Sequence, residues 1–326
     1  MNQTAFVTGA GGFIGSHIVE TLLNMGWSVK ALVHYNSRSQ AGWLTPYINT
    51  HKGIEIVWGD ICDAYQLLNL IKGCDAVFHL AALIGIPYSY QAIESYINTN
   101  VVGTLNVLKA SLHHKISRFI HTSTSEVYGT AQYQPIDEHH PLQAQSPYAA
   151  SKIAADKLVE SFHFAFNLPT VTIRPFNTYG PRQSARAVIP SIIIQALHSK
   201  MIHLGALDPI RDFTFITDTV NGFIAALNAD DHVIGQTIQL GTGVALSIDE
   251  LCSIIFELLG DQFQIVTDPT RIRPEKSEVK ALISNNNRAI TLLNWSPHVS
   301  LKQGLSETIE WIKQHNNLYH SNFYHQ

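Results

Sequence analysis

The chain has 326 residues, of which 45% are hydrophobic and 14% are charged, and its net charge is −4. This length suits a large α/β domain with a smaller lobe, and the weak negative charge excludes the electrostatic footprint of a nucleic-acid binder, so we expect a small-molecule partner. Three scattered cysteines without CxxC spacing indicate reduced thiols, and no apolar run reaches the roughly 20 residues of a membrane helix, so we expect a soluble, cytoplasmic protein.

The first 175 residues alternate short apolar runs with amphipathic stretches. We expect strands in AFVTG, SVKALV, IEIVWG, DAVFHLAA, RFIHTST and PTVTIRPF, with helices over 14–25, 64–72, 92–113 and 147–167 between them. Apolar strands that alternate with helices predict a parallel sheet covered on both faces, which is a doubly wound α/β fold. Ligands of such a sheet bind at the carboxyl ends of its strands.

The pattern loosens after Pro175. We expect a helix near 188–199, a strand in RDFTFIT, a helix after Asp218 and another that begins at Ser247, where Ser247 and Glu250 have capping-box spacing. Residues 176–316 are therefore expected to form mainly a smaller α/β substrate-binding lobe interleaved with the sheet. Residues 317–326 form a polar, histidine-rich tail, in which no carboxylate or paired helical spacing favours a metal site.

A glycine-rich turn joins the first strand to the first helix. In VTGAGGFIGSH, Gly9, Gly12 and Gly15 lie where the chain turns sharply, where backbone N–H groups meet a pyrophosphate and where the helix packs on its strand. Phe13 and Ile14 complete this turn. In this context the motif predicts a Rossmann-type dinucleotide-binding domain over residues 1–175.

The G-x-x-G-x-x-G spacing resembles that of the extended, sugar-nucleotide-modifying branch of the short-chain dehydrogenase/reductase superfamily. This resemblance implies a tightly bound and recycled NAD(P)+ cofactor. It also implies that Asp60 and Ile61, in GDI, contact the adenine and that Leu80, Ala81 and Ala82, in HLAA, lie beside the dinucleotide.

The segment after the second strand bears on the choice of cofactor. It reads His34, Tyr35, Asn36, Ser37 and Arg38, without an acidic residue to accept hydrogen bonds from the adenosine ribose. Arg38 and Ser37 suit the 2'-phosphate of NADP, whereas many relatives use NAD. The sequence leaves the two cofactors open.

Tyr148 and Lys152 in SPYAASKIAADKL have Y-x-x-x-K spacing, which brings both to one side of a helix. A lysine ammonium one turn away favours the phenolate, so that Tyr148 can accept a proton from a sugar hydroxyl. The resemblance covers nearly the whole chain, since TGAGGFIGSH, HLAA, NTNVVGTLNVL, TSTSEVYG, YAASK, RPFNTYGPR, RDFTFITD and NWSP follow in the family's order. It implies that Thr124 and Tyr148 bind the C4 oxygen and that Lys152 contacts the nicotinamide ribose.

Glu126 follows a buried strand in TSTSEVYG, where a carboxylate is costly unless it has a partner or a chemical role. Oxidation at C4 acidifies the C5 proton, and Glu126, two residues after Thr124, is placed to remove it as a general base. Loss of the C6 hydroxyl and return of hydride to C6 give a 4-keto-6-deoxy sugar, which is the 4,6-dehydratase reaction. Ser125 stands where the thymidine-diphosphoglucose dehydratases carry an aspartate, which leaves either Glu126 or a water as the acid for the leaving group.

Related reactions remain as alternatives. Sugar 4-epimerases usually carry small neutral residues at the position of Glu126, and UDP-glucuronate decarboxylases usually have Gly at that of Ser151. A dinucleotide-binding regulator without catalysis is the non-enzyme alternative. The segments ALVHYNSRS, IPYSYQAIESYINTN, TSTSEVYGTAQY and RPFNTYGPRQSARAVIPSII most resemble the nucleotide-diphospho-N-acetylglucosamine 4,6-dehydratases of legionaminic-acid pathways. The nucleotide, UDP or GDP, is left open.

Four residues are candidates for binding the substrate. Asn177, with Arg182 nearby, resembles the family asparagine that contacts the sugar diphosphate, and Arg211 and Arg273 are candidates to clamp it, because guanidinium matches phosphate bidentately. The resemblance also implies a homodimer through helices 92–113 and 147–167.

Overall fold

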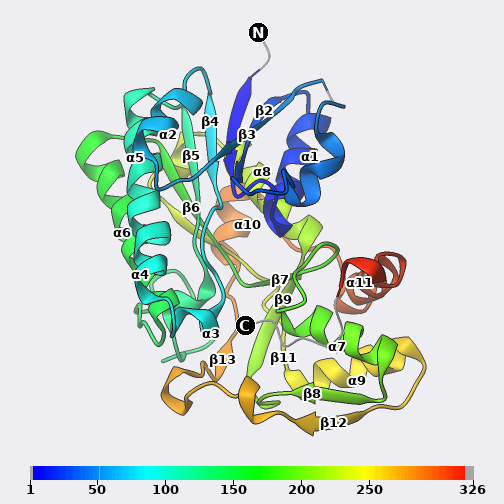
Figure 1. Cartoon of the computed structure of the whole chain (residues 1–326). Helices are drawn as coiled ribbons and strands as arrows, with labels where there is room; N and C mark the ends of the chain where they lie inside the picture. The colour runs from blue at the N-terminus through cyan, green and yellow to red at the C-terminus, as the bar shows by residue number, and fades with distance from the viewer. Residues whose placement is uncertain (1–2, 51, 320–326) are drawn as a thin grey trace.

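The computed structural model describes residues 3–50 and 52–319. Its centre is a seven-stranded sheet in the order β10-β6-β5-β4-β1-β2-β3, in which every neighbouring pair is parallel (Figure 1). The strands are β1 (Thr4–Thr8), β2 (Ser28–His34), β3 (Ile54–Gly59), β4 (Ala76–His79), β5 (Arg118–Thr122), β6 (Thr170–Pro175) and β10 (Thr237–Leu240). The doubly wound fold and six of its strands are confirmed. The edge strand β10, from the C-terminal half, was not predicted.

Helices cover both faces of this sheet (Figure 1). The helices α1 (Phe13–Asn24), α8 (Ile216–Asn228) and α10 (Asn287–Leu293) lie on one face, and α2 (Ala64–Leu70), α5 (Thr104–His113) and α6 (Pro147–Phe166) lie on the other. Side chains alternate along β1, so that Ala5 and Val7 join the first core while Phe6 joins the second. Burial on both faces explains the continuous apolar runs of the strands.

The helix predicted over residues 92–113 is interrupted. It consists of α4 (Ile93–Tyr96), a π-helical segment η2 (Ile97–Gly103) and α5, and it is preceded by the short helix α3 (Ile86–Ser89). Within η2, the buried Asn100 side chain accepts a hydrogen bond from Leu83 N at 2.8 Å and donates to Leu83 O at 2.9 Å. It also donates to Ser151 Oγ at 2.9 Å. The wide turn therefore joins the segment after β4 to α6.

The C-terminal half builds the smaller lobe at the bottom of Figure 1. Strand β9 (Ile210–Phe215) pairs with β7 (Asn177–Tyr179), β11 (Ala245–Ser247) and β13 (Ala281–Leu282), and β8 (Met201–Leu204) pairs with β12 (Gln264–Thr267). The lobe also contains α7 (Val188–His198), α9 (Ile248–Leu259) and α11 (Leu301–Gln314). The predicted capping box of Ser247 and Glu250 is confirmed at the start of α9, whereas α8 begins at Ile216, before Asp218.

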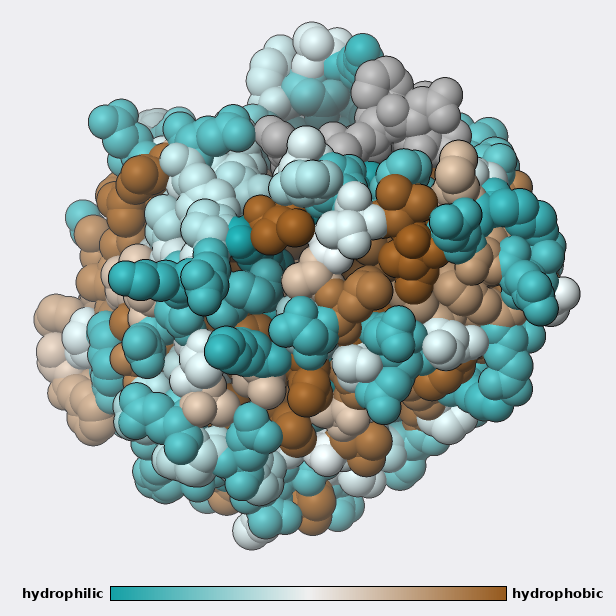
Figure 2. All heavy atoms as spheres, turned by 90° about the horizontal axis from the view of Figure 1, so that it is seen from below, coloured by the Kyte–Doolittle hydropathy of each residue, from teal (hydrophilic) through white to brown (hydrophobic). Residues whose placement is uncertain are grey.

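Short 3-10 helices complete the connections. They are η1 (Gly42–Tyr47), η3 (Ser125–Tyr128), η4 (Asp231–Val233), η5 (Pro269–Arg271), η6 (Glu275–Ser277) and η7 (Asn316–Leu318). Seen from the lobe's end of the molecule, hydrophilic and hydrophobic residues are interspersed over the surface (Figure 2). Among the helices of residues 3–50 and 52–319, none combines the length and the apolar character that crossing a bilayer requires. Most of the predicted polar tail, residues 320–326, lies outside the described residues.

Candidate active site

A cavity of about 1030 Å³ runs along the carboxyl ends of the parallel strands and extends into the smaller lobe. Its walls contain residues from the ends of β1 to β6 and from the lobe, which is where a doubly wound sheet binds its ligands. The lining includes Gly9, Gly12, Phe13, Ile14, Gly15, His34, Asn36, Asp60, Ile61, Leu80, Ala81, Ala82, Thr124, Glu126, Tyr148, Asn177, Arg211 and Arg273. Most of the predicted site residues therefore share one cavity.

The glycine turn fits a dinucleotide pyrophosphate. Gly9 has φ +66°, and a Cβ there would lie 2.8 Å from Ala81 N, so a side chain would displace the backbone that follows β4. A Cβ at Gly15 would lie 2.3 Å from Gly9 O. The N-terminus of α1 follows at once, with Gly12 as its N-cap, and its unpaired N–H groups attract phosphate. These residues can hold the diphosphate of NAD(P)+ against the end of β1.

Only some of the residues predicted to bind the adenosine end of the cofactor line the cavity. His34 and Asn36 line it together with Gln40, and His34 Nε2 lies 3.4 Å from Asp60 Oδ2. The Asn36 amide is held within its own loop, because it accepts from Arg38 N at 3.1 Å and donates to Gln40 O at 2.9 Å. Ser37 and Arg38 are exposed, and neither is among the described residues that line the cavity.

Thr124, Tyr148 and Lys152 meet where β5 ends beside α6. The Lys152 ammonium donates to Thr122 O at 2.7 Å, and Tyr148 hydrogen-bonds with Thr124. Burial raises the pKa of Tyr148, and the nearby negative charge of Glu126 raises it further. The hydrogen bond with Thr124 lowers this pKa and so offsets part of the rise. Burial lowers the pKa of Lys152 to about 8. The lowering of the tyrosine pKa by Lys152 stays a prediction.

Glu126 and Ser125 differ in their surroundings. Both belong to η3, but Glu126 is half-buried and lines the cavity. Ser125 is only 3% exposed and is not among the described residues that line the cavity. Glu126 also faces Arg211 closely enough for its charge to raise the pKa of that buried guanidinium, although burial lowers that pKa overall. Of the two, Glu126 is the side chain that a ligand in the cavity can contact.

The substrate end carries paired arginines. Arg211 Nη2 donates to Glu278 Oε1 at 3.1 Å, and Arg273 Nη1 lies 3.5 Å from the same oxygen. The predicted Arg182 is placed differently, because it pairs with Glu20 of α1 at 2.8 Å and donates to Ser16 Oγ at 3.2 Å. Arg182 thus fastens the loop after β7 to α1 rather than lining the described cavity.

Buried polar atoms without a hydrogen-bond partner occur on two predicted residues, Asn177 and Arg273, and on Gln183, which was not predicted. Among the described residues, Asn177 Oδ1 and Gln183 Oε1 are buried without a hydrogen-bond partner, and Arg273 Nη1 has only the long ion pair with Glu278. All three residues line the cavity. Such atoms are costly unless a ligand satisfies them. Gln183 and Arg186, which also line the cavity, lie in the segment RPFNTYGPRQSARAVIP, whereas Glu278 gave no signal because its hydrogen-bond partner Arg211 is 67 residues away.

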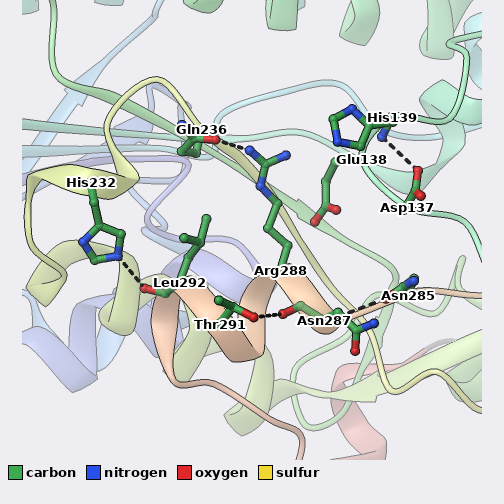
Figure 3. A pocket seen from close by; sticks show the side chains of 10 residues that line it. All are labelled: Asp137, Glu138, His139, His232, Gln236, Asn285, Asn287, Arg288, Thr291 and Leu292. Atoms are coloured by element: carbon green, nitrogen blue, oxygen red, sulfur yellow. Dashed lines mark hydrogen bonds between the residues drawn. The ribbon is translucent and has the colours of Figure 1, made fainter.

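A second cavity of about 510 Å³ lies beside β10 and α10 (Figure 3). Its polar groups are largely paired with each other or with backbone. Arg288 donates to Gln236, the Asp137 carboxylate accepts from His139 N at 3.0 Å, and Glu138 accepts from Gln239 N at 2.9 Å. The larger cavity, with its unpaired atoms and glycine turn, is the better candidate site. Among the described residues, no group of three or more His, Cys, Asp or Glu side chains is arranged to hold a metal.

Comparisons with known proteins agree with this geometry. The family described as GDP-mannose 4,6 dehydratase matches residues 6–308. A dTDP-glucose 4,6-dehydratase of Actinoplanes is 31% identical over 317 residues, which are 94% of this chain and 97% of that protein. UDP-glucuronic acid 4-epimerase from Bacillus cereus, solved with UDP-glucuronic acid and NAD, has a TM-score of 0.89 and 32% identity, covering 97% of this chain and all 100% of that one.

The solved dTDP-glucose 4,6-dehydratase DesIV of Streptomyces venezuelae, which also holds NAD, has a TM-score of 0.87 and 28% identity, over 97% of this chain and 99% of that one. NAD in both neighbours accords with the NAD(P)+ cofactor expected from the glycine turn. The chain belongs to the GDP-mannose 4,6-dehydratase family of extended short-chain dehydrogenases/reductases, which comprises NAD-dependent nucleotide-sugar dehydratases and epimerases.

Proposed function

We propose that the protein is a nucleotide-sugar 4,6-dehydratase that acts on a nucleotide-diphospho-N-acetylglucosamine. The observation that carries this proposal is Glu126, a carboxylate in the cavity wall that interacts electrostatically with Tyr148. A carboxylate at this place can remove the C5 proton once C4 is a ketone. The choice of sugar rests on the resemblance of segments such as ALVHYNSRS to the N-acetylglucosamine dehydratases.

The first half of the reaction makes the ketone. When bound, NAD(P)+ supplies an acceptor for the hydride from C4 and later a donor of that hydride to C6. Tyr148 removes the proton of the C4 hydroxyl, and the Thr124 hydroxyl orients the same oxygen. The Lys152 ammonium, one helical turn from Tyr148, stabilises the phenolate and binds the nicotinamide ribose.

The second half removes water. Glu126 takes the C5 proton, and the electron pair left at C5 expels the C6 hydroxyl. Because Ser125 is buried outside the lining, Glu126 returns its proton to the departing hydroxyl, so that one water leaves and the carboxylate is restored. Return of the hydride to C6 would leave an enolate, whose C4 oxygen Tyr148 and Thr124 hold. A water protonates C5, and this uptake is balanced by release of the proton that Tyr148 took from the C4 hydroxyl. The product is a 4-keto-6-deoxy sugar without net redox change.

Substrate binding is assigned to the lobe side of the cavity. Asn177, Arg211 and Arg273 bind the diphosphate, since their unpaired or cationic groups face the cavity. Arg182 supports this region from outside through its pair with Glu20.

A 4-epimerase is the second candidate, because a solved neighbour with 32% identity is UDP-glucuronic acid 4-epimerase. Epimerisation needs only the ketone and its rotation, so it leaves a general base at Glu126 without a function. A decarboxylase is disfavoured by Ser151, whose hydroxyl donates to Tyr148 O at 2.7 Å in the interior, where that class usually has glycine.

Mass spectrometry of the product tests these functions. The purified protein is incubated with UDP- and GDP-N-acetylglucosamine, UDP-glucose and UDP-glucuronic acid, without added reductant. A dehydratase gives a product lighter by one water from an N-acetylglucosamine nucleotide. A product of unchanged mass with altered configuration identifies an epimerase, and release of carbon dioxide from UDP-glucuronic acid identifies a decarboxylase. Either of these results without dehydration contradicts the proposal.

We also propose a homodimer through the helices near 92–113 and 147–167. Apolar side chains on the first of these are exposed, with Ile93 at 52%, Ile97 at 41% and Val102 at 41%. A second copy would cover them. Sedimentation at micromolar concentration should give the mass of a dimer, and Ile97→Glu should shift it to a monomer; a monomeric mass of the unaltered protein contradicts this assembly.

A further inference from the structure

Helix α6 presents three polar residues at intervals of four. Tyr148, Lys152 and Asp156 are all buried, and this spacing brings them to one side of the helix. The first two are the proposed catalytic pair. Asp156, one turn further along, has no step of its own in the reaction.

The three side chains all bind the end of β5 or the residues that follow it. Tyr148 bonds Thr124, the Lys152 ammonium bonds Thr122 O at 2.7 Å, and Asp156 Oδ2 accepts from Ser123 Oγ at 2.6 Å. The other Asp156 oxygen lies 3.1 Å from His121 Nε2. Three successive turns of α6 therefore bind residues 121–124, at the end of β5 and just after it, and Asp156 makes the contact to His121, deepest in the strand.

Asp156 forms an ion pair with the buried Arg174 and also acts electrostatically on the buried Lys152, one turn earlier on α6. Arg174 of β6 donates to Asp156 Oδ2 at 2.7 Å and is 4% exposed, and Lys152 is 5% exposed. On its far side, Arg174 donates to the hydroxyl of Tyr128 in η3 at 2.7 Å.

The remaining neighbour, His121, carries no charge. Burial lowers its pKa to about 4, so the ring is neutral, and its Nε2–H donates to Asp156 while Nδ1 has no partner. His79 of β4 stacks on it at 5.7 Å, and burial lowers the pKa of His79 as well. Of the described residues, the charged groups that act on Asp156 are therefore Arg174 and Lys152, and Glu138 interacts electrostatically with Arg174.

We propose that Asp156 is a positioning residue for the reaction, which fixes α6 on β5 and supplies the negative charge that holds the Lys152 ammonium in its buried place. This inference rests on the proposed role of Lys152. The network beneath the cavity then has a function beyond packing, because the Asp156 carboxylate acts on both Arg174 and Lys152.

Because Asp156 and Arg174 carry opposite charges, their substitution should shift the pKa of Lys152 in opposite directions. Burial lowers the pKa of Lys152 to about 8, and Asp156 raises it against that effect. Asp156→Asn removes the anion, so the lysine should lose its proton at lower pH. Arg174→Gln removes the competing cation, so the carboxylate should hold the lysine proton to higher pH. The double substitution restores the net charge around Lys152.

The first measurement is the pH profile of cofactor reduction by the nucleotide sugar, which does not depend on whether dehydration follows. Asp156→Asn should move the alkaline fall in rate to lower pH by roughly one unit, Arg174→Gln should move it to higher pH, and the double variant should return close to the parent. A purely structural role would lower all three rates and would move neither this fall nor the pH dependence of unfolding. That combined result overturns the proposal.

The second measurement is the pH dependence of thermal unfolding, which needs no reaction. The folded pKa of Lys152, about 8, lies below its ordinary value of 10.5, so the unfolded chain binds the extra proton and stability should rise as pH increases between these values. Lys152→Met, which cannot titrate, gives the baseline. In the Asp156→Asn variant, this rise in stability should begin at a lower pH.

The two measurements separate the inference from the proposed function. If the unfolding profile moves while the rate profile does not, the charge coupling stands and the catalytic role of Lys152 is wrong. If neither profile moves in the single variants, Asp156 does not govern the lysine charge and the inference is wrong.

Discussion

Arg211 donates a hydrogen bond to Glu278 at 3.1 Å in the wall of the cavity, and this carboxylate also faces Arg273 at 3.5 Å. The negative charge of Glu278 compensates the arginines while the cavity holds no anion. A substrate diphosphate must compete with it for the same guanidinium groups.

Glu278→Gln should therefore strengthen the binding of nucleotide diphosphates. Removing one partly buried carboxylate relieves its repulsion of the diphosphate by about 1 kcal/mol, which corresponds to about a fivefold lower Kd for UDP or GDP. Isothermal titration calorimetry measures this Kd. Glu275→Gln, on the exposed 3-10 helix η6, is the matched control and should leave Kd unchanged. Weaker binding by Glu278→Gln alone would mean that Glu278 orients the arginines for the ligand instead.

Glu126→Gln should separate ketone formation from dehydration. The amide keeps the shape of the side chain but cannot accept the C5 proton, so we expect cofactor reduction to persist while product formation falls by about 10² to 10⁴-fold. Stopped-flow absorbance follows the first step, and mass spectrometry follows the second. Glu94→Gln, on the exposed face of α4, is the control. Normal dehydration by Glu126→Gln would assign the base to another group.

Ser125→Ala should change the turnover number by less than about threefold, because the Ser125 hydroxyl is buried outside the cavity lining and removing it leaves Glu126 in place. The same mass assay measures it. A loss of dehydration with cofactor reduction intact would instead make Ser125 part of the proton path to the C6 hydroxyl.

Arg38→Ala should distinguish the two cofactors. Arg38 is exposed beside the adenosine end, and only a 2'-phosphate gives it a ligand, so the Kd for NADPH should rise about tenfold while that for NADH stays the same. Fluorescence titration of both cofactors measures this, with Lys72→Ala as a control for the loss of one exposed cation. Equal weakening for the two cofactors would show that Arg38 acts on the loop and not on the phosphate.

Acid should destabilise the protein through His121. Burial lowers its folded pKa to about 4 from an ordinary 6.5, so the unfolded chain binds the proton first and stability should fall as pH decreases between these values. The loss amounts to about 3 kcal/mol for this histidine. In urea unfolding, His121→Gln should flatten this slope, although His79, whose pKa burial also lowers, keeps part of it. An unchanged slope in His121→Gln would assign the acid sensitivity elsewhere.

The sequence predicted the cavity well where the signal was local or followed from strand topology. The glycine turn, HLAA, TSTSE and YAASK each lie at a strand or helix end, and parallel strands bring such ends to one edge. Tyr148 and Lys152 were predicted to share a helix face because four residues make about one turn.

The parts that were missed depend on contacts between distant segments. Strand β10 has only four residues, and it becomes a strand by pairing with β6 at the sheet edge. The position of Arg182 is set by Glu20, and the environment of Arg211 by Glu278, both remote in sequence. A single sequence does not reveal such partners, because an arginine has the same local signature in an ion pair and in a phosphate site.

The π-helical segment Ile97–Gly103 makes the helix before the active site sensitive to length. A π turn holds about one residue more than an α turn, so deletion of one residue there would convert it to regular helix while α4 and α5 keep nearly the same orientation about the helix axis. The Asn100 amide would leave both backbone groups of Leu83 and the hydroxyl of Ser151. The extra residue of this turn therefore has a local consequence: it places Asn100 between the segment after β4 and α6 without changing how α4 and α5 face the rest of the molecule.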